Sequence, residues 1–254
     1  MAPMTFEASG EHYDRFMGRY LPELAVALAD TAGVHQGQRA LDVGCGPGGL
    51  TRELVSRLGA ENVTALDPSE SFSAACRERN PGVDVRLGVA EEMPFADNSF
   101  DVALASLSVP FMSDPVQGVR EMARVARSVS VCVWDYNGGM EMLRVFWGAA
   151  REIDPEVPDE RTQVGGSPDD LGRIFAEAGL GEIEEGVLEV GAGYSGFDDW
   201  WEPFGYGIGP AGSYFVSLDE ELQSALREEC RRRLGDPQGP FRGDARAWVA
   251  TGAG

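Results

Sequence analysis

The sequence predicts an α/β fold built on a doubly wound and mostly parallel sheet. Short apolar runs alternate with helical segments through the first half of the chain, which is the pattern of a parallel sheet covered by helices. A glycine-rich loop over residues 44–49 follows the first apolar run and opens a helix, as in sheets of this kind that bind ligands. With 254 residues, the chain suits one large α/β domain or a domain with a cap, and it can bury a sizeable core.

The first part of the chain predicts helices and strands in regular order. Apolar residues recur at three- and four-residue steps over residues 11–30, which predicts an amphipathic helix interrupted near Pro22. The following strands are expected at residues 39–43, 62–66, 83–87, 100–105 and 130–134, and the helices between them at 49–58, 67–80 and 116–126.

After residue 135 the regular alternation ends. An amphipathic segment rich in Met, Phe and Trp comes first and is followed by a linker rich in proline and acidic residues. Two further strands are expected, separated by a long insertion that carries an aromatic run and a charged helix. In chain order these segments are 140–151, the linker 154–159, a helix at 169–178, a strand at 183–190, the insertion 191–243 with aromatic residues at 200–204 and a helix at 218–234, and the last strand at 245–251.

The composition argues against charged polymers as partners. The formal net charge is −21, and affinity for nucleic acid comes largely from cationic groups that neutralise phosphates. An anionic membrane surface is disfavoured for the same reason, and no apolar run approaches the roughly 20 residues that span a bilayer. The N-terminus lacks the basic, apolar and small-residue segments of a signal peptide in their usual order, so the protein is expected in the cytoplasm. It is expected to be a monomer or homodimer, without nucleic-acid or membrane partners.

Several reactive residue types are scarce. The absence of lysine excludes a Schiff-base lysine, and hence pyridoxal phosphate chemistry, as well as the phosphate-binding lysine of a P-loop. The two histidines, His12 and His35, are both early, which excludes a hydrolase triad with a late histidine. The four cysteines are far apart and lack metal-ligand spacing, so no metal is expected. Chemistry must therefore come from a ligand, or from carboxylates and hydroxyls.

The glycine loop is preceded by an acidic residue, in the order Asp42, Gly44, Cys45, Gly46. The pattern G-x-G-x-x-G is shared with NAD enzymes, whose pyrophosphate lies against the glycine amides at the helix N-terminus. A carboxylate two residues before the first glycine disfavours that anion and suits a ligand with ammonium and sulfonium charges. The segment resembles motif I of class I S-adenosylmethionine-dependent methyltransferases, which implies S-adenosylmethionine as the cofactor. The alternative is an ordinary glycine-rich turn.

Asp67 and Pro68 follow the second expected strand. In the family that the chain resembles, an acidic residue at this place holds the two ribose hydroxyls of the cofactor, and an ionised carboxylate is suited to accepting both hydrogen bonds. The alternative is a helix N-cap, because aspartate followed by proline at the first helical position is a common helix start.

Two further segments resemble cofactor-contacting segments of the same family. Residues 88–95 resemble the segment that contacts adenine, but Val89 stands where the family often has an aspartate. The resemblance therefore leaves the contact to the backbone of Val89 and Ala90 or to Glu91, and the alternative is a loop that packs the third strand. After the fourth strand, Ser106 and Leu107 are implied to contact the methionine part. The family often carries histidines where this chain has Pro110 and Phe111.

Residues 11–20 resemble the N-terminal helix that closes over the cofactor in relatives of the ubiquinone and menaquinone biosynthesis methyltransferases. Tyr13 and Arg19 are implied to reach the methionine carboxylate, with Met17 on the same segment, because arginine suits bidentate carboxylate binding. The alternative is a core tyrosine and a solvated arginine. The resemblance implies a Rossmann-like seven-stranded sheet with an antiparallel last strand, in one domain of residues 1–254. Its parts are a lid at 1–36, a cofactor-binding core at 37–135, and cap insertions at 136–165 and 191–243.

Aromatic and apolar residues of the second half are candidates for the wall of an acceptor site, and three residues are candidates for a general base. The alternative for the aromatic residues is a hydrophobic core. The acceptor candidates are Trp134, Tyr136, Met140, Trp200 and Trp201, and the candidate bases are His12, Asp135 and Glu202.

These features predict an S-adenosylmethionine-dependent methyltransferase that acts on a small molecule. The first alternative is an NAD(P)-dependent oxidoreductase with the same glycine loop, against which Asp42 and residues 88–95 count. The second is a cofactor-binding regulatory protein that has lost transfer activity, which the cofactor site alone does not distinguish. The acceptor is expected to be neutral or cationic, and aromatic or isoprenoid-like.

Overall fold

A computed structural model of the chain describes residues 15–157 and 164–254. Its sheet has seven strands in the order β3-β2-β1-β4-β5-β7-β6. Strands β1 to β5 pair in parallel, and β7 pairs with β5 in the antiparallel direction. This confirms the expected Rossmann-like sheet with an antiparallel last strand. The strands are β1 (Ala40–Val43), β2 (Val63–Asp67), β3 (Asp84–Leu87), β4 (Phe100–Ser106), β5 (Ala126–Trp134), β6 (Gly181–Tyr194) and β7 (Phe241–Ala253).

The chain divides into two compact units, and both β6 and β7 contribute residues to each. The larger unit, called the sheet unit here, comprises residues 21–134, 164–189 and 246–254 of the described chain. The smaller one, called the helical unit, comprises residues 15–20, 135–157 and 190–245.

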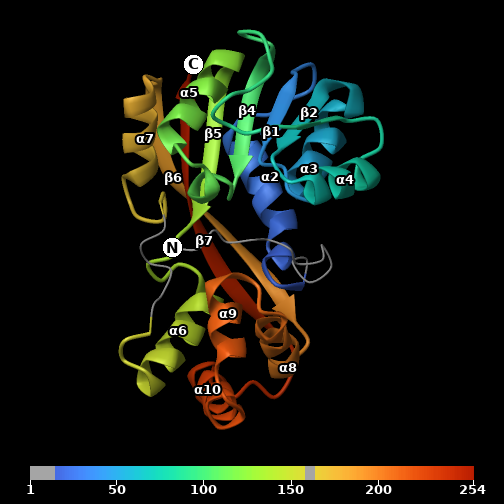
Figure 1. Ribbon diagram of the computed structural model, residues 1–254. Coiled ribbons are helices and arrows are strands. Elements are labelled where there is room, and N and C mark those ends of the chain that lie inside the picture. The colour runs from blue at the N-terminus through green and yellow to red at the C-terminus, as the bar shows by residue number, and fades with distance from the viewer. Residues whose placement is uncertain (1–14, 158–163) are drawn as a thin grey trace. The chain divides into compact units, whose positions relative to one another are not determined.

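In the sheet unit, strands β1, β4 and β5 form the centre and are buried over most of their length. Such strands are apolar on both faces because helices cover both sides of a parallel sheet. Figure 1 shows α3 and α4 beside β1 and β2, and α5 next to α7. The helices are α2 (Leu21–Thr31), α3 (Gly49–Leu58), α4 (Glu70–Arg79), α5 (Pro115–Val125) and α7 (Asp170–Ala178), with short 3₁₀ turns at η2 (Ala60–Asn62) and η3 (Val109–Phe111).

The strand order reverses at β1, which has β2 on one side and β4 on the other. In doubly wound sheets ligands bind beyond the carboxyl ends of the strands at this reversal point. The glycine loop leaves β1 there, and Asp67 ends β2 next to it. The topology therefore directs attention to the residues that follow β1, β2 and β4.

The helical unit has an aromatic core. Phe146 and Phe204 stack with ring centroids 4.4 Å apart, and Trp200 packs edge-on against Phe204 at 5.2 Å. All three side chains are almost completely buried, so aromatic burial is the main cohesive contribution in this unit. Its elements are η1 (Met17–Arg19), α6 (Glu141–Ile153), α8 (Phe197–Trp201), η4 (Glu202–Tyr206), α9 (Gly209–Ser217) and α10 (Glu220–Arg233).

Most expected elements are present, but β6 and β7 extend beyond the expected 183–190 and 245–251, and α9 was not expected. Two further differences concern β5 and the first helix. Strand β5 begins at Ala126, immediately after α5, and not at residue 130, because Ala126 and Ser128 extend the pairing with β4 although the segment is partly polar. The helix expected over residues 11–30 is interrupted at Tyr20, between η1 and α2, and therefore before Pro22 and not at it. Pro22 is in the first turn of α2, where its missing N–H costs nothing. Within the described residues, none of the helices combines the length and the apolar character needed to cross a bilayer.

Candidate functional site

The glycine loop connects β1 to α3 and is fixed to the neighbouring strand. The N–H groups of Gly44 and Cys45 both donate to the carbonyl of Leu66 in β2, at 2.7 and 3.1 Å. Gly44, Gly46 and Gly48 all have φ in the left-handed region, at 71°, 53° and 92°. Only glycine adopts this conformation without steric cost, which explains why the sharp turn from strand to helix contains so many glycines.

Asp42 lies on β1 beneath this loop and is 1% exposed. One carboxylate oxygen accepts a hydrogen bond of 2.6 Å from the Thr51 hydroxyl on α3. The other oxygen, Oδ1, is buried and has no hydrogen-bond partner among the described residues. Burial raises the pKa of Asp42 to about 7, although the hydrogen bond from Thr51 favours the ionised form. A buried carboxylate oxygen without a partner is suited to a hydrogen-bond donor from a ligand.

We expect Asp42→Asn to gain stability relative to the wild type as the pH rises from 5 to 8. The unfolded carboxyl loses its proton near its ordinary pKa of 3.8, whereas the folded one keeps it up to about pH 7. The contribution of the Asp42 carboxyl to the free energy of unfolding is therefore fully present below pH 4 and is lost as the pH rises through 7. At about 1.4 kcal/mol per pKa unit, the loss is on the order of 3 kcal/mol. Urea unfolding of both proteins across this range measures the difference.

Thr51→Val serves as the companion variant for this measurement. Removing the hydroxyl that donates to Asp42 makes ionisation still less favourable. We therefore expect the pH window of the stability loss to move upward in Thr51→Val. Unfolding free energies of the wild type and Asp42→Asn that run parallel from pH 5 to 8 would contradict the raised pKa.

Asp67, the last residue of β2, joins two segments through its carboxylate. One oxygen accepts from the N–H of Gly46 in the glycine loop and the other from the N–H of Ser69, each at 2.8 Å. The helix cap expected as an alternative for Asp67 is supplied by Ser69 instead, whose hydroxyl accepts from the N–H of Phe72 at 3.3 Å. Burial raises the pKa of Asp67 above its ordinary value. Two lone-pair sites of the carboxylate remain available for further hydrogen bonds, while Pro68 is exposed.

The segment after β3 contains the residues expected at adenine. Val89 is exposed and Ala90 is buried. The side chain of Glu91 contacts the start of α5: one of its oxygens accepts from the N–H and the hydroxyl of Ser113, at 2.6 and 2.8 Å, and from the N–H of Asp114 at 3.2 Å. Burial acts to raise the pKa of Glu91, but these hydrogen bonds outweigh it and the pKa is lowered. The Glu91 side chain is thus engaged in positioning α5, and Val89 and Ala90 present the segment's backbone.

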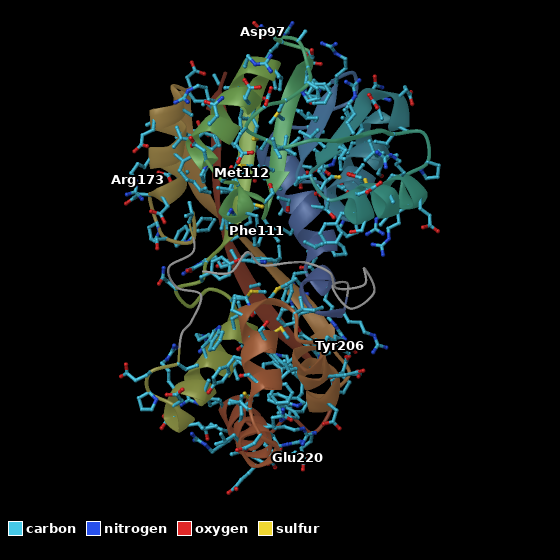
Figure 2. The ribbon with its side chains drawn as sticks, viewed as in Figure 1. Asp97, Phe111, Met112, Arg173, Tyr206 and Glu220 are labelled. Carbon is cyan, nitrogen blue, oxygen red and sulfur yellow. The ribbon has the colours of Figure 1, made fainter. Side chains whose placement is uncertain are left out.

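The end of β4 holds an unusual backbone conformation. Leu107 has φ of 62°, which is rare for a residue with a side chain, and its N–H donates to the carbonyl of Cys132 in β5 at 2.9 Å. Such conformations cost roughly 1–3 kcal/mol and cluster at functional sites. The next residue, Ser108, donates to the carbonyl of Val43 at 2.9 Å, so the ends of β4 and β1 are joined. Figure 2 labels Phe111 and Met112, which follow in the same segment.

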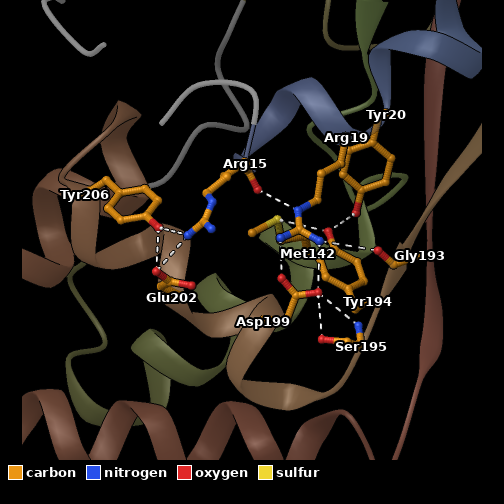
Figure 3. A network of polar contacts seen from close by, with 10 residues as sticks. All are labelled: Arg15, Arg19, Tyr20, Met142, Gly193, Tyr194, Ser195, Asp199, Glu202 and Tyr206. Atoms are coloured by element: carbon orange, nitrogen blue, oxygen red, sulfur yellow. Dashed lines mark hydrogen bonds and ion pairs between the residues drawn. The ribbon is translucent and has the colours of Figure 1, made fainter. Parts of the chain in front are cut away.

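Arg19, in the helical unit, is paired with Asp199. Its guanidinium binds both carboxylate oxygens of Asp199, one of them at 3.0 Å, and lies over the ring of Tyr194 (Figure 3). The hydrogen bonds from Arg19 lower the pKa of Asp199 to about 2. The neighbouring Tyr20 shares a hydrogen bond of 2.9 Å with the hydroxyl of Tyr194. The role of Arg19 at a ligand carboxylate stays a prediction, and in that role Arg19 would have to exchange Asp199 for the ligand.

The remaining candidates of the helical unit lie in different surroundings. Glu202 is exposed and accepts from Arg15 at 3.0 Å and from Tyr206 at 2.7 Å (Figure 3). Asp135 is 1% exposed and accepts from the N–H of Asn137 at 2.9 Å. Met17 is half-buried. The candidates His12 and Tyr13 lie outside the described residues.

The aromatic candidates for an acceptor wall are mostly buried. Trp200 and Trp201 are 1% and 8% exposed, and both pack against Phe204 in the aromatic core of the helical unit. Met140 is also buried and bridges to Ala245. Tyr136 is half-buried, and Trp134 is buried at the end of β5 in the sheet unit. Their packing gives them a structural role, and their contact with an acceptor stays a prediction.

Comparison with known proteins identifies the segment that carries the glycine loop. Residues 41–133 match the family described as a methyltransferase domain. We call this matched segment the methyltransferase domain below. An uncharacterized methyltransferase of Mycobacterium tuberculosis is 35% identical over 124 residues, which are 49% of this chain and 48% of that protein. A demethylmenaquinone methyltransferase of Renibacterium salmoninarum is 36% identical over 100 residues, 39% of this chain and 41% of that protein. The chain thus spans less than half the length of these two relatives.

A solved structure shows the same fold as the methyltransferase domain and its surroundings. It is described as a type II methyltransferase from Anaeromyxobacter dehalogenans, is 22% identical and covers 92% of this chain and 97% of its own, with a TM-score of 0.65. At this identity the likeness establishes the shared fold.

The methyltransferase domain fits S-adenosylmethionine by three observations in its own residues. Asp42 Oδ1 is buried without a partner among the described residues, Asp67 retains acceptor capacity beside the loop, and a Cβ added at Gly46 would meet no atom within 4 Å. The glycine loop therefore has a face at Gly46 that the described residues leave open. Two carboxylates accompany the loop: Asp42 precedes it on β1, and Asp67 binds it from the end of β2. A ligand with ribose hydroxyls and a cationic group suits this donor and acceptor set.

Three residues that support the loop were missed by the sequence analysis. Thr51 binds Asp42, Ser108 holds Val43, and Asn80 donates to the carbonyl of Gly48 at 3.3 Å. Thr51 could have been found, because it shares a helix face with Leu54 and Leu58 at three- and four-residue steps, and a hydroxyl on a buried face needs a partner. Asn80 follows the buried Ser73 and Cys76 at the same steps, whereas Ser108 lies in a segment without such a period.

Proposed function

We propose that the protein is an S-adenosylmethionine-dependent methyltransferase that acts on a small-molecule acceptor. The observation that carries the proposal is the carboxylate of Asp67, held at the end of β2 within 2.8 Å of the glycine loop N–H of Gly46. This arrangement lies in a methyltransferase domain at the reversal point of a doubly wound sheet. The cofactor, when bound, supplies a methyl group already activated on a sulfonium.

The chain's own residues then bind and orient. Asp67 accepts from ribose hydroxyls, and the open face of the loop at Gly46 allows close approach of a ligand. Asp42, whose pKa is about 7, would be stabilised in its charged form by the cationic group of a bound ligand. Such positioning can contribute roughly 7–11 kcal/mol toward the barrier of a two-substrate reaction. No residue is required to form a covalent intermediate.

The alternatives are less well supported. A pyrophosphate-binding oxidoreductase would place an anion near the glycine amides and the Asp42 carboxylate, and the carboxylate disfavours that anion. The matching family and the two relatives described above are also named as methyltransferases, not as oxidoreductases. A cofactor-binding protein without transfer activity shares the donor site, so only an acceptor distinguishes it. The absence of a metal requirement and the cytoplasmic location stay predictions.

For the acceptor we propose a neutral or cationic aromatic or isoprenoid-like small molecule. The net charge of −21 disfavours anionic acceptors at long range. Relatives with named acceptors support the aromatic class: they include demethylmenaquinone methyltransferases and a 2-methyl-6-phytyl-1,4-hydroquinone methyltransferase of rice. A general base is of use if a hydroxyl is methylated, and Asp135, Glu202 and His12 are the proposed candidates.

Calorimetry followed by a transfer assay tests this proposal. We expect S-adenosylmethionine and S-adenosylhomocysteine to bind and NAD not to bind. With radiolabelled methyl donor and a panel of small phenols, hydroquinones and amines, label should pass to at least one acceptor and should do so in the presence of EDTA. Binding of NAD in place of S-adenosylhomocysteine would replace the proposal with the oxidoreductase, and loss of transfer in EDTA that one divalent ion restores would contradict the metal-independent reaction.

A further inference from the structure

Two cysteine thiols lie together beneath the glycine loop. Cys45 belongs to the loop and Cys76 to α4, and both side chains belong to one buried cluster with Ala65 and Val85. Both are free thiols. The loop packs closely on α4 at this point: a Cβ added at Gly48 would lie 2.9 Å from the sulfur of Cys76. The sequence separates the two cysteines by thirty residues, and the fold makes them neighbours.

The surroundings of Cys76 favour its thiolate. The interaction with the neighbouring Cys45 outweighs the opposing effect of burial. The Cys76 thiol donates to the Thr51 hydroxyl at 3.6 Å, and the side-chain N–H of Asn80 donates to the Cys76 sulfur at 3.7 Å. Together they lower the pKa of Cys76 to about 7. The interaction with Cys76 and burial raise the pKa of Cys45, and burial raises the pKa of Cys132 and Cys230, so Cys76 is the one of the four thiols whose pKa is lowered.

We propose that Cys45 and Cys76 are a modification site, at which a hydroperoxide converts the two thiols into a disulfide that disables the glycine loop for cofactor binding. The second half of this inference rests on the proposed function, since it assigns the loop to the cofactor. Cys45 keeps 6% exposure and Cys76 none, so the loop side is the entry for a small peroxide.

The reaction balances with the peroxide as the oxidant. The Cys76 thiolate attacks one peroxide oxygen, the O–O bond breaks, and the departing oxygen leaves as hydroxide or alkoxide, which takes up a proton. The sulfur of Cys45 then attacks the sulfenic acid sulfur, the S–S bond forms, the S–O bond breaks and water leaves. In total, two thiols and one hydroperoxide give one disulfide, one water and one water or alcohol.

The consequence for the loop follows from the geometry of a disulfide. The two sulfurs must approach to about 2.04 Å, which is far shorter than any separation of two sulfur atoms that are not bonded. Cys45 is therefore drawn toward α4, and its neighbour Gly46 moves with it. The N–H of Gly46 donates to Asp67 at 2.8 Å, so the movement disturbs the pair of groups that the proposed function assigns to the donor.

Peroxide treatment of the purified, reduced protein tests both halves. We expect the number of titratable thiols in denatured samples to fall from four to two, and peptide mapping without reductant to show a Cys45–Cys76 cross-link. The dissociation constant of S-adenosylhomocysteine should rise by about tenfold or more, which corresponds to 1.4 kcal/mol, and dithiothreitol should restore it. Cofactor present before the peroxide should slow the cross-linking.

Cys76→Ser and Cys230→Ser are the matched variants. We expect peroxide to leave the affinity of Cys76→Ser within about twofold of its own untreated value, while Cys230→Ser responds like the wild type. Peroxide that leaves four thiols, or oxidises them without the cross-link, overturns the modification site. A cross-link with unchanged affinity overturns its effect on the loop. Because mapping needs no cofactor, reduced protein that cross-links but never binds S-adenosylhomocysteine contradicts the proposed function and leaves the disulfide supported.

Discussion

Asp67→Ala is expected to weaken S-adenosylhomocysteine binding by about 1.5–3 kcal/mol, which corresponds to roughly 10- to 150-fold in the dissociation constant. The carboxylate is the acceptor that the methyltransferase domain places beside the glycine loop, and alanine offers no acceptor in its place. The substitution also leaves the N–H groups of Gly46 and Ser69 without their partner, so some loss of stability is expected. Calorimetry on protein shown to be folded by circular dichroism measures the affinity.

Two comparisons separate ribose binding from weakening of the fold. Ser69→Ala removes the cap of α4 from the same turn, which costs about 1 kcal/mol of stability, and should leave the affinity nearly intact. An analogue of S-adenosylhomocysteine without ribose hydroxyls should bind the wild type more weakly but bind Asp67→Ala as well as the parent compound does. Equal losses of affinity for both ligands in Asp67→Ala would remove the ribose assignment and leave Asp67 with a structural role.

The part of the site that could be predicted from the sequence is the part that local pattern determines. The glycines at 44, 46 and 48 predict a turn that only glycine adopts without steric cost. The apolar runs before Asp42 and Asp67 predict two strands that end beside each other in a parallel sheet. Alternation of strands and helices predicts that β1 to β5 run parallel, whereas their order in the sheet is given by the fold, because doubly wound sheets with the same alternation occur in more than one order.

The pairings of charged side chains could not be predicted in this way. Arg19 binds Asp199, which is 180 residues away, and Glu91 binds the backbone at Ser113 and Asp114. The chain carries 42 acidic residues and 21 basic ones, so the sequence offers each arginine many partners of similar quality. Only the tertiary fold selects among them, and it assigns Arg19 and Glu91 contacts within the protein. The aromatic residues at 200–204 show the same limit, since their pattern fits a core as well as an acceptor wall.

Gly46→Ala is expected to lower S-adenosylhomocysteine affinity by about tenfold or more while costing only about 1–2 kcal/mol of stability. Gly46 has φ of 53°, so alanine incurs the cost of the left-handed conformation. Its added methyl group meets no protein atom within 4 Å and therefore extends into the open face of the loop. The N–H that donates to Asp67 is retained. If this face receives the cofactor, the methyl group occupies space that the ligand needs. Calorimetry and urea unfolding measure the two effects separately.

Gly33→Ala is the matched control, because it shares both properties of Gly46 at a distant place. Gly33 follows α2 with φ of 63°, and a Cβ there also meets no atom within 4 Å. The two variants should therefore lose similar stability, about 1–2 kcal/mol each, and differ only in affinity. Equal affinities in Gly46→Ala and Gly33→Ala would mean that the open face of the glycine loop is not where the donor binds. An affinity loss confined to Gly46→Ala cannot be attributed to backbone strain, because Gly33→Ala carries the same strain, and it would assign that face to the cofactor.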